Sequence, residues 1–306
     1  MNAILKSVSR SFYLTIRFLP GPLREPVSLG YLLARATDTI ADTATIPASV
    51  RLTILRGFAQ VVAGELDFAG VTDSLRDFAA RQTDPAERRL IEQLDAILDW
   101  LTRVEPADRE DIRSVLQTIV RGQELDLERF GDPTRAVALR SAAELEEYTY
   151  LVAGCVGQFW TRLGFRHFVN FATRLPDEMT ELGIEYGKGL QLINVLRDRA
   201  ADEKNGRSYL PAGESAARWL ARAEKEIGAG IAYASALTSW RLRFATALPA
   251  LIGARTIARL RAAGPTDEKI KVSRNEIRRI LATGALAAAS PLALRRRFDR
   301  LLLISG

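Results

Sequence analysis

Apolar residues recur at helical spacing along almost the whole of this 306-residue chain, and this periodicity restricts the fold more than any other feature. In residues 90–101 and 112–119, leucine, isoleucine and valine return every three or four positions, as on one face of a helix. Four longer stretches are rich in Ala, Leu, Glu and Arg, which favour helix, namely 142–163, 178–200, 214–233 and 237–262. Runs of alternating β-branched residues between tight turns are nearly absent. We therefore predict an all-α fold.

Proline and glycine divide these helices at short breaks, such as Pro20-Gly21-Pro22, Asp84-Pro85 and Gly264-Pro265. Pro22 and Pro85 stand where a proline in the first turn of a helix would stand. No stretch has the composition of a flexible linker, and no short repeat is present. We expect a single domain over residues 1–306, with its core at about 9–285 and a basic C-terminal helix at 286–306.

The composition excludes several classes of site. A single cysteine, Cys155, excludes a disulfide framework and a cysteine-cluster metal site, and it is expected in the core. A single histidine, His167, excludes a multi-histidine zinc site, argues against a Ser-His-Asp triad, and is expected at a boundary or surface. No apolar run approaches the ~20 residues of a membrane span, and the first residues lack the apolar stretch of a secretory signal. We expect a cytoplasmic location.

Residues 27–46 carry a polar stripe on an otherwise apolar or small-residue segment. Tyr31, Arg35, Asp38 and Asp42 stand at i, i+4, i+7 and i+11, so they share one face of a helix. A surface helix would also carry charges on its opposite side, so this helix is predicted to be buried with its carboxylates facing inward. Buried carboxylates need a cation, which Arg35 or a metal ion could supply.

Residues 187–211 carry a second stripe of the same kind. Gln191, Asn194, Asp198 and Asp202 stand at i, i+3, i+7 and i+11 among apolar neighbours. Each of the two stripes therefore has two aspartates near one another on a helix, which suits a hard cation such as Mg²⁺. Mg²⁺ takes further ligands from water and phosphate, so we expect the two faces to hold a diphosphate and to stabilise its departure.

Arginines next to both stripes are the candidate partners of that diphosphate: Arg10, Arg35, Arg197 and Arg207. The alternative is that the aspartates form structural salt bridges, Asp38 with Arg35 and Asp198 with Arg197. The second pairing is disfavoured because adjacent residues of a helix do not face each other.

Four motifs in order make the chain resemble the squalene/phytoene synthase family of head-to-head prenyl transferases. They are SRSF at 9–12, YLLARATDTIAD at 31–42, YTYLVAGCVG at 148–157, and LQLINVLRDRAAD with NGRSYLP at 190–211. A weaker one is KVSRNEIRRIL at 271–281. The resemblance runs from Ser9 to about residue 285.

This resemblance implies an all-α isoprenoid synthase fold, a helical bundle around a central hydrophobic cavity. It implies that two farnesyl diphosphates condense head to head through a cyclopropyl intermediate, presqualene diphosphate. In squalene synthases a second ionisation and hydride transfer from NADPH complete the product, and the YTYLVAGCVG segment is closer to those enzymes. Dehydrosqualene or phytoene synthase is the alternative. A non-catalytic binding or assembly factor is less consistent with the retained aspartates, and a class I terpene cyclase does not account for SRSF.

The resemblance also implies roles for the residues that match its motifs. Asp38 and Asp42 correspond to the first Mg²⁺-binding motif, and Asp198 and Asp202 to the second. Tyr148 matches the catalytic tyrosine near the first ionisation and proton loss. The candidate diphosphate-binding residues are Arg10, Arg35, Arg197, Arg207, Gln191, Asn194 and Tyr31, of which Tyr31 matches an aromatic of the active-site wall.

Two positions depart from the pattern of the family, and one group of small residues allows two interpretations. Ala41 and Thr43 stand where many eukaryotic squalene synthases have acids, which predicts a weaker metal affinity but no change of role. Ala153, Gly154 and Gly157 are small, which would either leave room for a prenyl chain or allow close helix packing.

NADPH would have to bind without a nucleotide-binding domain, because no Rossmann glycine pattern is present. Lys271 and Arg274 are candidates for contacts with its phosphate, and ordinary surface charge is the alternative.

Positive charge is concentrated at the C-terminal end. Residues 251–306 hold twelve Lys or Arg and four Asp or Glu, whereas the rest of the chain has a net charge of −2. In the last segment, arginines alternate with Leu292, Leu294, Phe298 and Leu301 to Leu303, so this helix could contact an anionic membrane or simply close the domain. We expect no nucleic-acid partner, because the bulk of the chain is slightly acidic and has no matching motif. Peripheral contact with the inner face of the membrane remains open.

Overall fold

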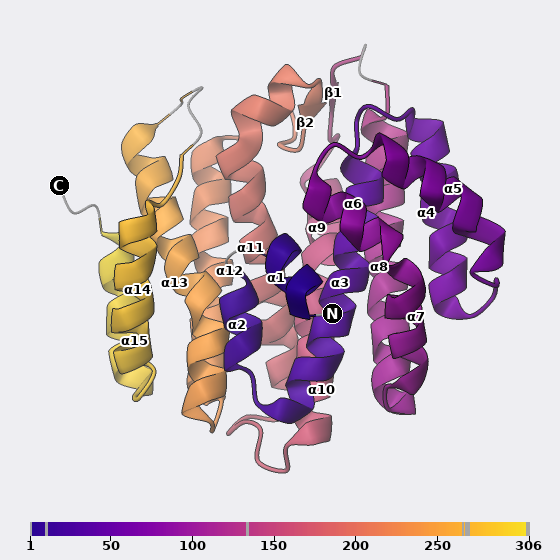
Figure 1. Ribbon diagram of the computed structural model, residues 1–306. Coiled ribbons are helices and arrows are strands. Elements are labelled where there is room, and N and C mark those ends of the chain that lie inside the picture. The colour runs from indigo at the N-terminus through magenta and orange to yellow at the C-terminus, as the bar shows by residue number, and fades with distance from the viewer. Residues whose placement is uncertain (1, 10–11, 133–134, 265, 267–269, 304–306) are drawn as a thin grey trace. The chain divides into compact units, whose positions relative to one another are not determined.

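The computed structural model describes residues 2–9, 12–132, 135–264, 266 and 270–303 (Figure 1). The helices of the first part of the chain are α1 (Asn2–Ser9), α2 (Phe12–Phe18), α3 (Gly21–Asp42), α4 (Ala48–Ala63), α5 (Ala69–Arg81), α6 (Pro85–Glu92), α7 (Leu94–Arg103) and α8 (Pro106–Phe130). The elements of the second part are β1 (Val137–Ala138), α9 (Ala142–Thr149), the π-helix η1 (Tyr150–Gly154), α10 (Cys155–His167), α11 (Pro176–Lys204), β2 (Arg207–Ser208), α12 (Ala216–Ala236), α13 (Trp240–Ala263), α14 (Arg274–Ala287) and α15 (Pro291–Leu302).

The chain divides into two compact units. The first comprises residues 1–17 and 21–132, and the second comprises residues 18–20 and 133–306. Apart from two paired strands of two residues each, every regular element among the described residues is helical, so the prediction of an all-α fold is confirmed. The single domain and the central cavity expected from the sequence remain predictions.

The first unit is built around α3. This helix packs against α4 and α8, and further along its length against α6 and α7. Leu29, Leu32, Leu33 and Ile40 of α3 are fully buried, as its apolar composition predicts. No charge lies on its buried side: Asp38 is half-buried and Asp42 is exposed, so the prediction that both carboxylates face inward is wrong for Asp42.

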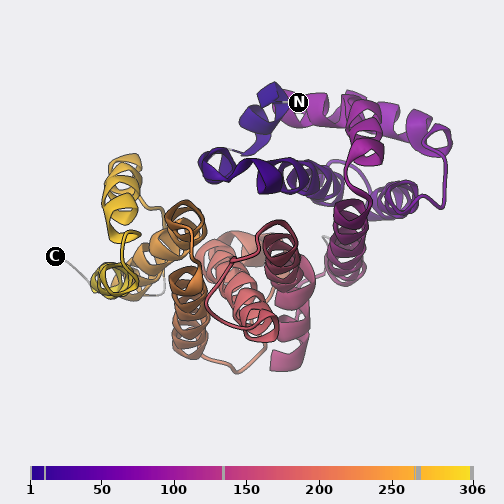
Figure 2. The same ribbon diagram turned by 90° about the horizontal axis from the view of Figure 1, so that it is seen from below.

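The second unit is built around the 29-residue helix α11, which packs against α10, α12 and α13. Figure 2 shows α14 and α15 lying on α13 at the outer side of this unit, and the contacts among these three helices agree with that view. Tyr233 and Phe171 form part of its core, where the Tyr233 hydroxyl lies 2.9 Å from that of Thr161. No helix in the described part of the chain is long and apolar enough to cross a membrane.

Helix ends follow the sequence signals closely. Asp84 caps α6 by accepting hydrogen bonds from the backbone amides of Ala86 and Glu87, and Pro85 occupies the first turn as predicted. Pro22 likewise lies in the first turn of α3. Ser273 and Glu276 form a reciprocal capping box at the start of α14.

Close contact with the α11 backbone explains the small residues of η1 and α10. A Cβ added to Gly157 would lie 1.9 Å from the carbonyl oxygen of Gly183, and one added to Gly187 would lie 2.2 Å from that of Ala153. Such distances mean that two backbones touch where any side chain would separate them. Of the two interpretations of Ala153, Gly154 and Gly157, the structure supports close helix packing.

Substituting either contact glycine should therefore destabilise the second unit. We expect Gly157→Ala and Gly187→Ala each to lower the free energy of unfolding by about 1–3 kcal/mol, because an extra methyl group has no space. Gly228→Ala is the matched control: this glycine also lies in a helix, but a Cβ there would meet nothing within 4 Å. It should leave stability unchanged or raise it by up to ~1 kcal/mol. Urea unfolding of the three variants is the measurement, and equal effects at all three positions would contradict the packing account.

Candidate functional site

The polar stripe of α3 places Asp38 opposite a residue that the sequence analysis did not identify. Gln123 of α8 is 7% exposed, and its Nε2 donates a 2.6 Å hydrogen bond to Oδ1 of Asp38. Its other amide atom, Oε1, is buried and has no hydrogen-bond partner in the described part of the chain. A glutamine 85 residues away in the sequence carries no local signal of this pairing.

Arg35 does not form the salt bridge with Asp38 that was one alternative from the sequence. Its Nη2 instead bonds Oε1 of Glu87 in α6. Arg35 still lies close enough to lower the pKa of Asp38, but its direct hydrogen bond goes elsewhere. The structural interpretation of the first stripe is therefore not supported, and Glu87 is a second residue that the sequence did not reveal.

The surroundings of Asp38 disfavour the ionised form of its carboxyl group. Burial, followed by the like charge of Asp42, raises the pKa of Asp38 to about 7 against the opposing effects of Arg35 and Gln123. A carboxylate in such surroundings favours either a proton or a cation. The donor set around it, two carboxylates and the unpartnered Gln123 Oε1, consists of the oxygen ligands that Mg²⁺ and Ca²⁺ bind.

The two remaining residues predicted near this stripe have different outcomes. The Tyr31 hydroxyl donates a 3.2 Å hydrogen bond to the carbonyl oxygen of Val8 and so ties α3 to α1. This contact is structural, whatever else Tyr31 does. Arg10 lies outside the described residues.

On α11 the second stripe forms a line of hydrogen bonds that ends at Tyr148. Asn194 Nδ2 donates to Gln191 Oε1 over 3.2 Å, and Gln191 Nε2 donates to the Tyr148 hydroxyl over 3.4 Å. The ring of Tyr209 stacks on that of Tyr148 with centroids 4.8 Å apart. The structure thus brings together three of the predicted residues and adds Tyr209 of the NGRSYLP motif, for which the sequence predicts no separate role.

Arg197 and Asp198 do form an ion pair, contrary to the argument from their adjacency. Arg197 Nε lies 3.2 Å from Asp198 Oδ1, and Nη2 lies 2.5 Å from Oδ2. The length and flexibility of the arginine side chain let its guanidinium reach back to the neighbouring carboxylate, which the backbone directions alone would not allow. Asp202 follows one turn later on the same helix, half-buried.

Arg207 is held at a defined place by the short parallel strand pair. β2 pairs with β1 so that Val137 lies opposite Arg207 and Ala138 opposite Ser208. The backbone amide of Val137 donates to the carbonyl oxygen of Gly206 over 2.9 Å. Gly206 has a φ of 76°, a conformation that glycine adopts readily, and it turns the chain from α11 into β2.

An ion-pair network fixes the helices around Tyr148. Glu146 of α9 bonds Arg222 of α12 at 2.5 Å and Lys188 of α11 at 3.5 Å, and Arg222 also bonds Glu226 at 2.8 Å. Burial raises the pKa of Glu146, but the hydrogen bonds and charges of Arg222 and Lys188 outweigh it, and the pKa falls below its usual value. Glu146 stands two residues before Tyr148, and Lys188 stands three residues before Gln191. The network therefore fixes the helices that carry Tyr148 and Gln191 relative to each other.

The π-helix η1 begins two residues after Tyr148. Such turns insert an extra residue into a helix and occur often at functional sites. Here the insertion lies where the chain leaves the Tyr148 turn and enters the close contact with α11. Sequence periodicity predicted one helix over 142–163 and could not show this irregular turn.

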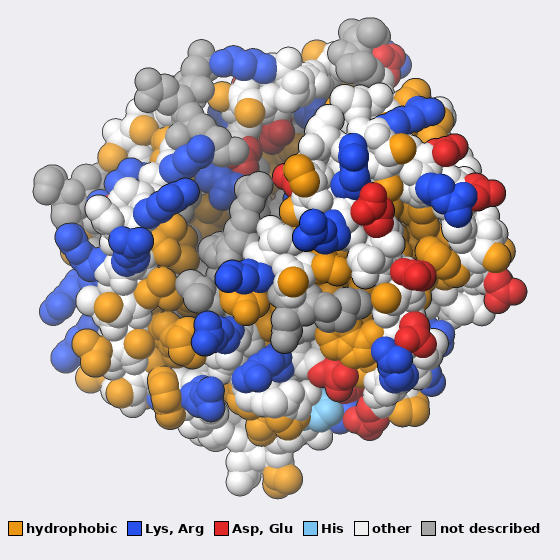
Figure 3. All heavy atoms as spheres, in the orientation of Figure 1, with side chains coloured by type: hydrophobic (Ala, Val, Ile, Leu, Met, Phe, Trp, Pro, Cys, Tyr) orange, Lys and Arg blue, Asp and Glu red, His pale blue; other side chains and the backbone are white. Residues whose placement is uncertain are grey.

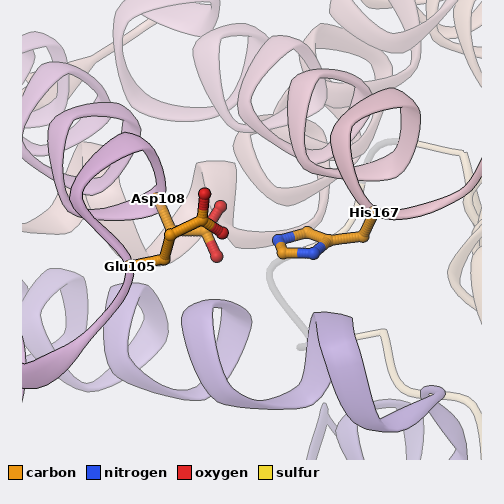
Figure 4. A group of neighbouring side chains, drawn as sticks. All are labelled: Glu105, Asp108 and His167. Atoms are coloured by element: carbon orange, nitrogen blue, oxygen red, sulfur yellow. The ribbon is translucent and has the colours of Figure 1, made fainter.

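Figure 4 shows Glu105 and Asp108 at the start of α8, with both carboxylates turned to the same side. His167 is the last residue of α10 in the second unit and is half-buried, as expected for a boundary position. None of these residues lies on the stripes of α3 or α11, and we assign no metal site to them.

A model of the squalene/phytoene synthase family matches residues 5–217, which include both stripes and Tyr148. The chain belongs to the squalene/phytoene synthase family. Its relatives include squalene synthase BSS of Botryococcus braunii, 29% identical over 65% of this chain and 39% of that protein. A bifunctional lycopene cyclase/phytoene synthase of Pyrenophora tritici-repentis is 30% identical over 72% of this chain and 34% of that protein. The matched region thus spans well under half the length of these family relatives.

Solved structures of family members share the fold. TcSQS in complex with the ligand E5700 has a TM-score of 0.75 at 21% identity, covering 98% of this chain and 88% of that one. A dehydrosqualene synthase has a TM-score of 0.61 at 22% identity, covering 92% and 93%. These family structures establish the all-α isoprenoid synthase fold.

The pKa of Asp38 predicts how the metal-free protein responds to pH. In the folded state Asp38 holds a proton up to about pH 7, whereas in the unfolded chain it releases the proton near pH 4. The folded state therefore binds more protons between these values, and Asp38 should lower stability as pH rises through this range, by at most about 1.4 kcal/mol per pH unit. Thermal unfolding in EDTA of wild type and Asp38→Asn measures the difference. The variant should gain on wild type as pH rises from 5 to 7.5, and parallel curves would contradict the assignment.

Proposed function

We propose that this protein is a Mg²⁺-dependent prenyltransferase that joins two farnesyl diphosphates head to head. Membership of the squalene/phytoene synthase family supports the reaction class. The observation that carries the proposal for this chain is the partly buried carboxylate of Asp38, which lies near Asp42 and makes no ion pair with Arg35, because Arg35 pairs with Glu87. A non-catalytic family member would have no need to keep a carboxylate in these unfavourable surroundings.

The specific product that we propose is squalene, formed through presqualene diphosphate. Relatives named squalene synthase, such as ERG9 of Saccharomyces cerevisiae at 28% identity over 68% of this chain, support this choice. The reaction joins two carbons, releases two diphosphates and one proton, and takes one hydride from NADPH. Dehydrosqualene or phytoene formation is the second candidate, and it releases a second proton in place of the hydride uptake. Family members named phytoene and dehydrosqualene synthase support that alternative.

The carboxylates of each stripe would hold the metal ions. Asp38 and Asp42 are the ligands that we propose on α3, with Gln123 Oε1 available beside them, and Asp198 and Asp202 are the ligands on α11. When bound, Mg²⁺ would neutralise the diphosphate charge and so favour its departure from the prenyl carbon. Arg197, Arg207 and Arg35 are the proposed diphosphate-binding cations within the described residues.

Tyr148 is the proposed acceptor of the proton that is lost when the new carbon–carbon bond forms. Its Oη receives a hydrogen bond from Gln191, which in turn is oriented by Asn194. With this donor in place, a lone pair of Oη stays directed away from Gln191. The stacked Tyr209 ring restricts the Tyr148 ring to one plane, so its hydroxyl is preorganised.

NADPH use rests on the family resemblance. Lys271 and Arg274 are both exposed at the start of α14, where positive charge suits a phosphate. The Lys271 carbonyl accepts a 2.9 Å hydrogen bond from Arg259, which fixes the backbone there. NADPH binding at this place remains a prediction. A cytoplasmic location and a membrane contact of the basic C-terminal segment are likewise predictions.

The product assay tests this proposal. Purified protein is incubated with farnesyl diphosphate and Mg²⁺, with and without NADPH, and the extract is analysed by mass spectrometry. Squalene should form only with NADPH. Asp38→Asn and Asp198→Asn should each lower turnover by roughly 100-fold or more, since each removes charge that the proposed metal site requires.

Asp95→Asn and Asp177→Asn are the matched controls, because both aspartates are exposed and lie outside the stripes. They should retain wild-type turnover. Dehydrosqualene or phytoene as the product would select the second candidate and keep the site. No product from farnesyl or geranylgeranyl diphosphate would contradict the enzymatic function.

A further inference from the structure

The apolar face of the C-terminal helix follows one of the two alternatives from the sequence, which was that this helix closes the domain. Leu294, Phe298 and Leu301 are buried in the second unit, where α15 packs against α12 and α13. These side chains close the unit and are not accessible to a membrane. The amphipathic pattern of α15 therefore explains its packing, and any membrane contact must depend on other side chains.

Exposed apolar side chains gather instead at the corner where α13 begins and α14 turns into α15. Trp240 is 54% exposed, Leu286 is 78% exposed and Leu292 is 60% exposed. Arg243 joins the elements that carry them, because its Nη1 donates to the Ala288 carbonyl over 2.9 Å and its Nη2 to that of Leu237 over 2.7 Å. We call these three exposed residues the apolar tip.

The loop that follows α10 lies against the same corner. The Thr238 amide donates to the Phe171 carbonyl over 3.1 Å, and the Thr173 amide donates to the Ala236 carbonyl over 2.8 Å. This loop carries Val169, which is wholly exposed. The apolar tip is thus extended by this loop.

Arginines without acidic partners lie on the helices above the apolar tip. Within the described residues, Arg279, Arg296, Arg297 and Arg300 make no ion pair, whereas Arg295 pairs with Asp299. Nε of Arg297 is buried and has no hydrogen-bond partner there. Burial lowers the pKa of Arg297, and the nearby charges of Arg300 and Arg279 lower it further. Three like charges thus lie close together with nothing anionic between them.

The space-filling view shows both features on one side of the second unit. In Figure 3, Lys and Arg side chains gather at the left, over α14 and α15, and hydrophobic side chains lie at the lower end of the same helices. The succession from apolar side chains to arginines matches the succession from lipid tails to phosphates at a bilayer surface.

We propose that this face docks on an anionic membrane, with Trp240, Leu286 and Leu292 in the interfacial region and Arg279, Arg296, Arg297 and Arg300 on lipid phosphates. Tryptophan is enriched at such interfaces because its ring is apolar and its N–H is polar. The guanidinium groups of the exposed Arg279, Arg296 and Arg300 would donate hydrogen bonds to phosphate oxygens.

Charge favours a membrane over the other partners that such a face could have. In a symmetric contact with a second copy of this chain, the unpaired arginines of the two copies would face and repel each other. Nucleic acid would supply phosphates, but its charged backbone would offer no apolar surface for the three exposed apolar side chains. The docking does not depend on the proposed enzymatic function.

Vesicle flotation tests the proposal with the full chain. Vesicles of phosphatidylcholine alone are compared with vesicles that contain about a third phosphatidylglycerol, at low salt and at about 1 M salt. The protein should float with the anionic vesicles at low salt, and salt should weaken this binding. Arg296→Glu/Arg300→Glu should reduce the affinity by at least about 25-fold, since each basic residue near an anionic surface contributes about fivefold. Trp240→Ser/Leu286→Ser should also reduce binding, and the remaining binding should be more sensitive to salt.

Two control variants separate this face from general effects of charge and hydrophobicity. Arg81→Glu/Arg121→Glu makes the same charge change on exposed residues of the first unit, and Val50→Ser/Leu66→Ser removes exposed apolar side chains there. Both controls should bind as wild type does. Failure of wild type to float, or equal losses in the first-unit arginine variant, would overturn the proposal. A dimer in sedimentation that Trp240→Ser/Leu286→Ser abolishes would identify the tip as a contact between chains and would also overturn it.

Discussion

The main constraint in the first unit is the charge balance around the partly buried carboxylate of Asp38. Asp38 lies beside Asp42 on a helix whose other faces are committed to the apolar core. The nearest arginine on the same helix bonds Glu87, and Gln123 offers only an amide donor. Positive charge from outside the protein is therefore the simplest way to satisfy this group at neutral pH. The divalent cation that we propose at this place would meet that requirement.

In the second unit, the main constraint is that the packing holds the hydroxyl group of Tyr148 in one place. Contacts between glycines bring η1 and α10 against the α11 backbone, and the network around Glu146 adds α12. The Tyr148 hydroxyl then meets Gln191, and its ring meets Tyr209. Here the carboxylate Asp198 is already paired with Arg197, so the two units differ in how their aspartates are compensated without metal.

Helix content, helix ends and the two stripes could be predicted from the sequence, because each depends on residues close together in the chain. Apolar periodicity located α11, α12 and α13 to within a few residues, and Asp84-Pro85 marked the start of α6. The partners Gln123 and Glu87 could not be predicted, because packing of distant helices brings them to α3. The pair of Arg197 with Asp198 was missed because the argument considered backbone directions and not the reach of a long side chain. The membrane expectation assigned Leu294 and Phe298 to a surface, whereas both are core residues, and the exposed apolar side chains lie on three elements.

The central claim is that the aspartates of each stripe bind divalent cations, which in turn hold a prenyl diphosphate. Isothermal titration with farnesyl thiodiphosphate, an analogue that ionises slowly, tests it directly in the presence and absence of Mg²⁺. The account predicts Mg²⁺-dependent binding to wild type that weakens by at least about tenfold in Asp38→Asn and again in Asp198→Asn. Binding that is equally tight without Mg²⁺, or unchanged in both variants, would contradict it.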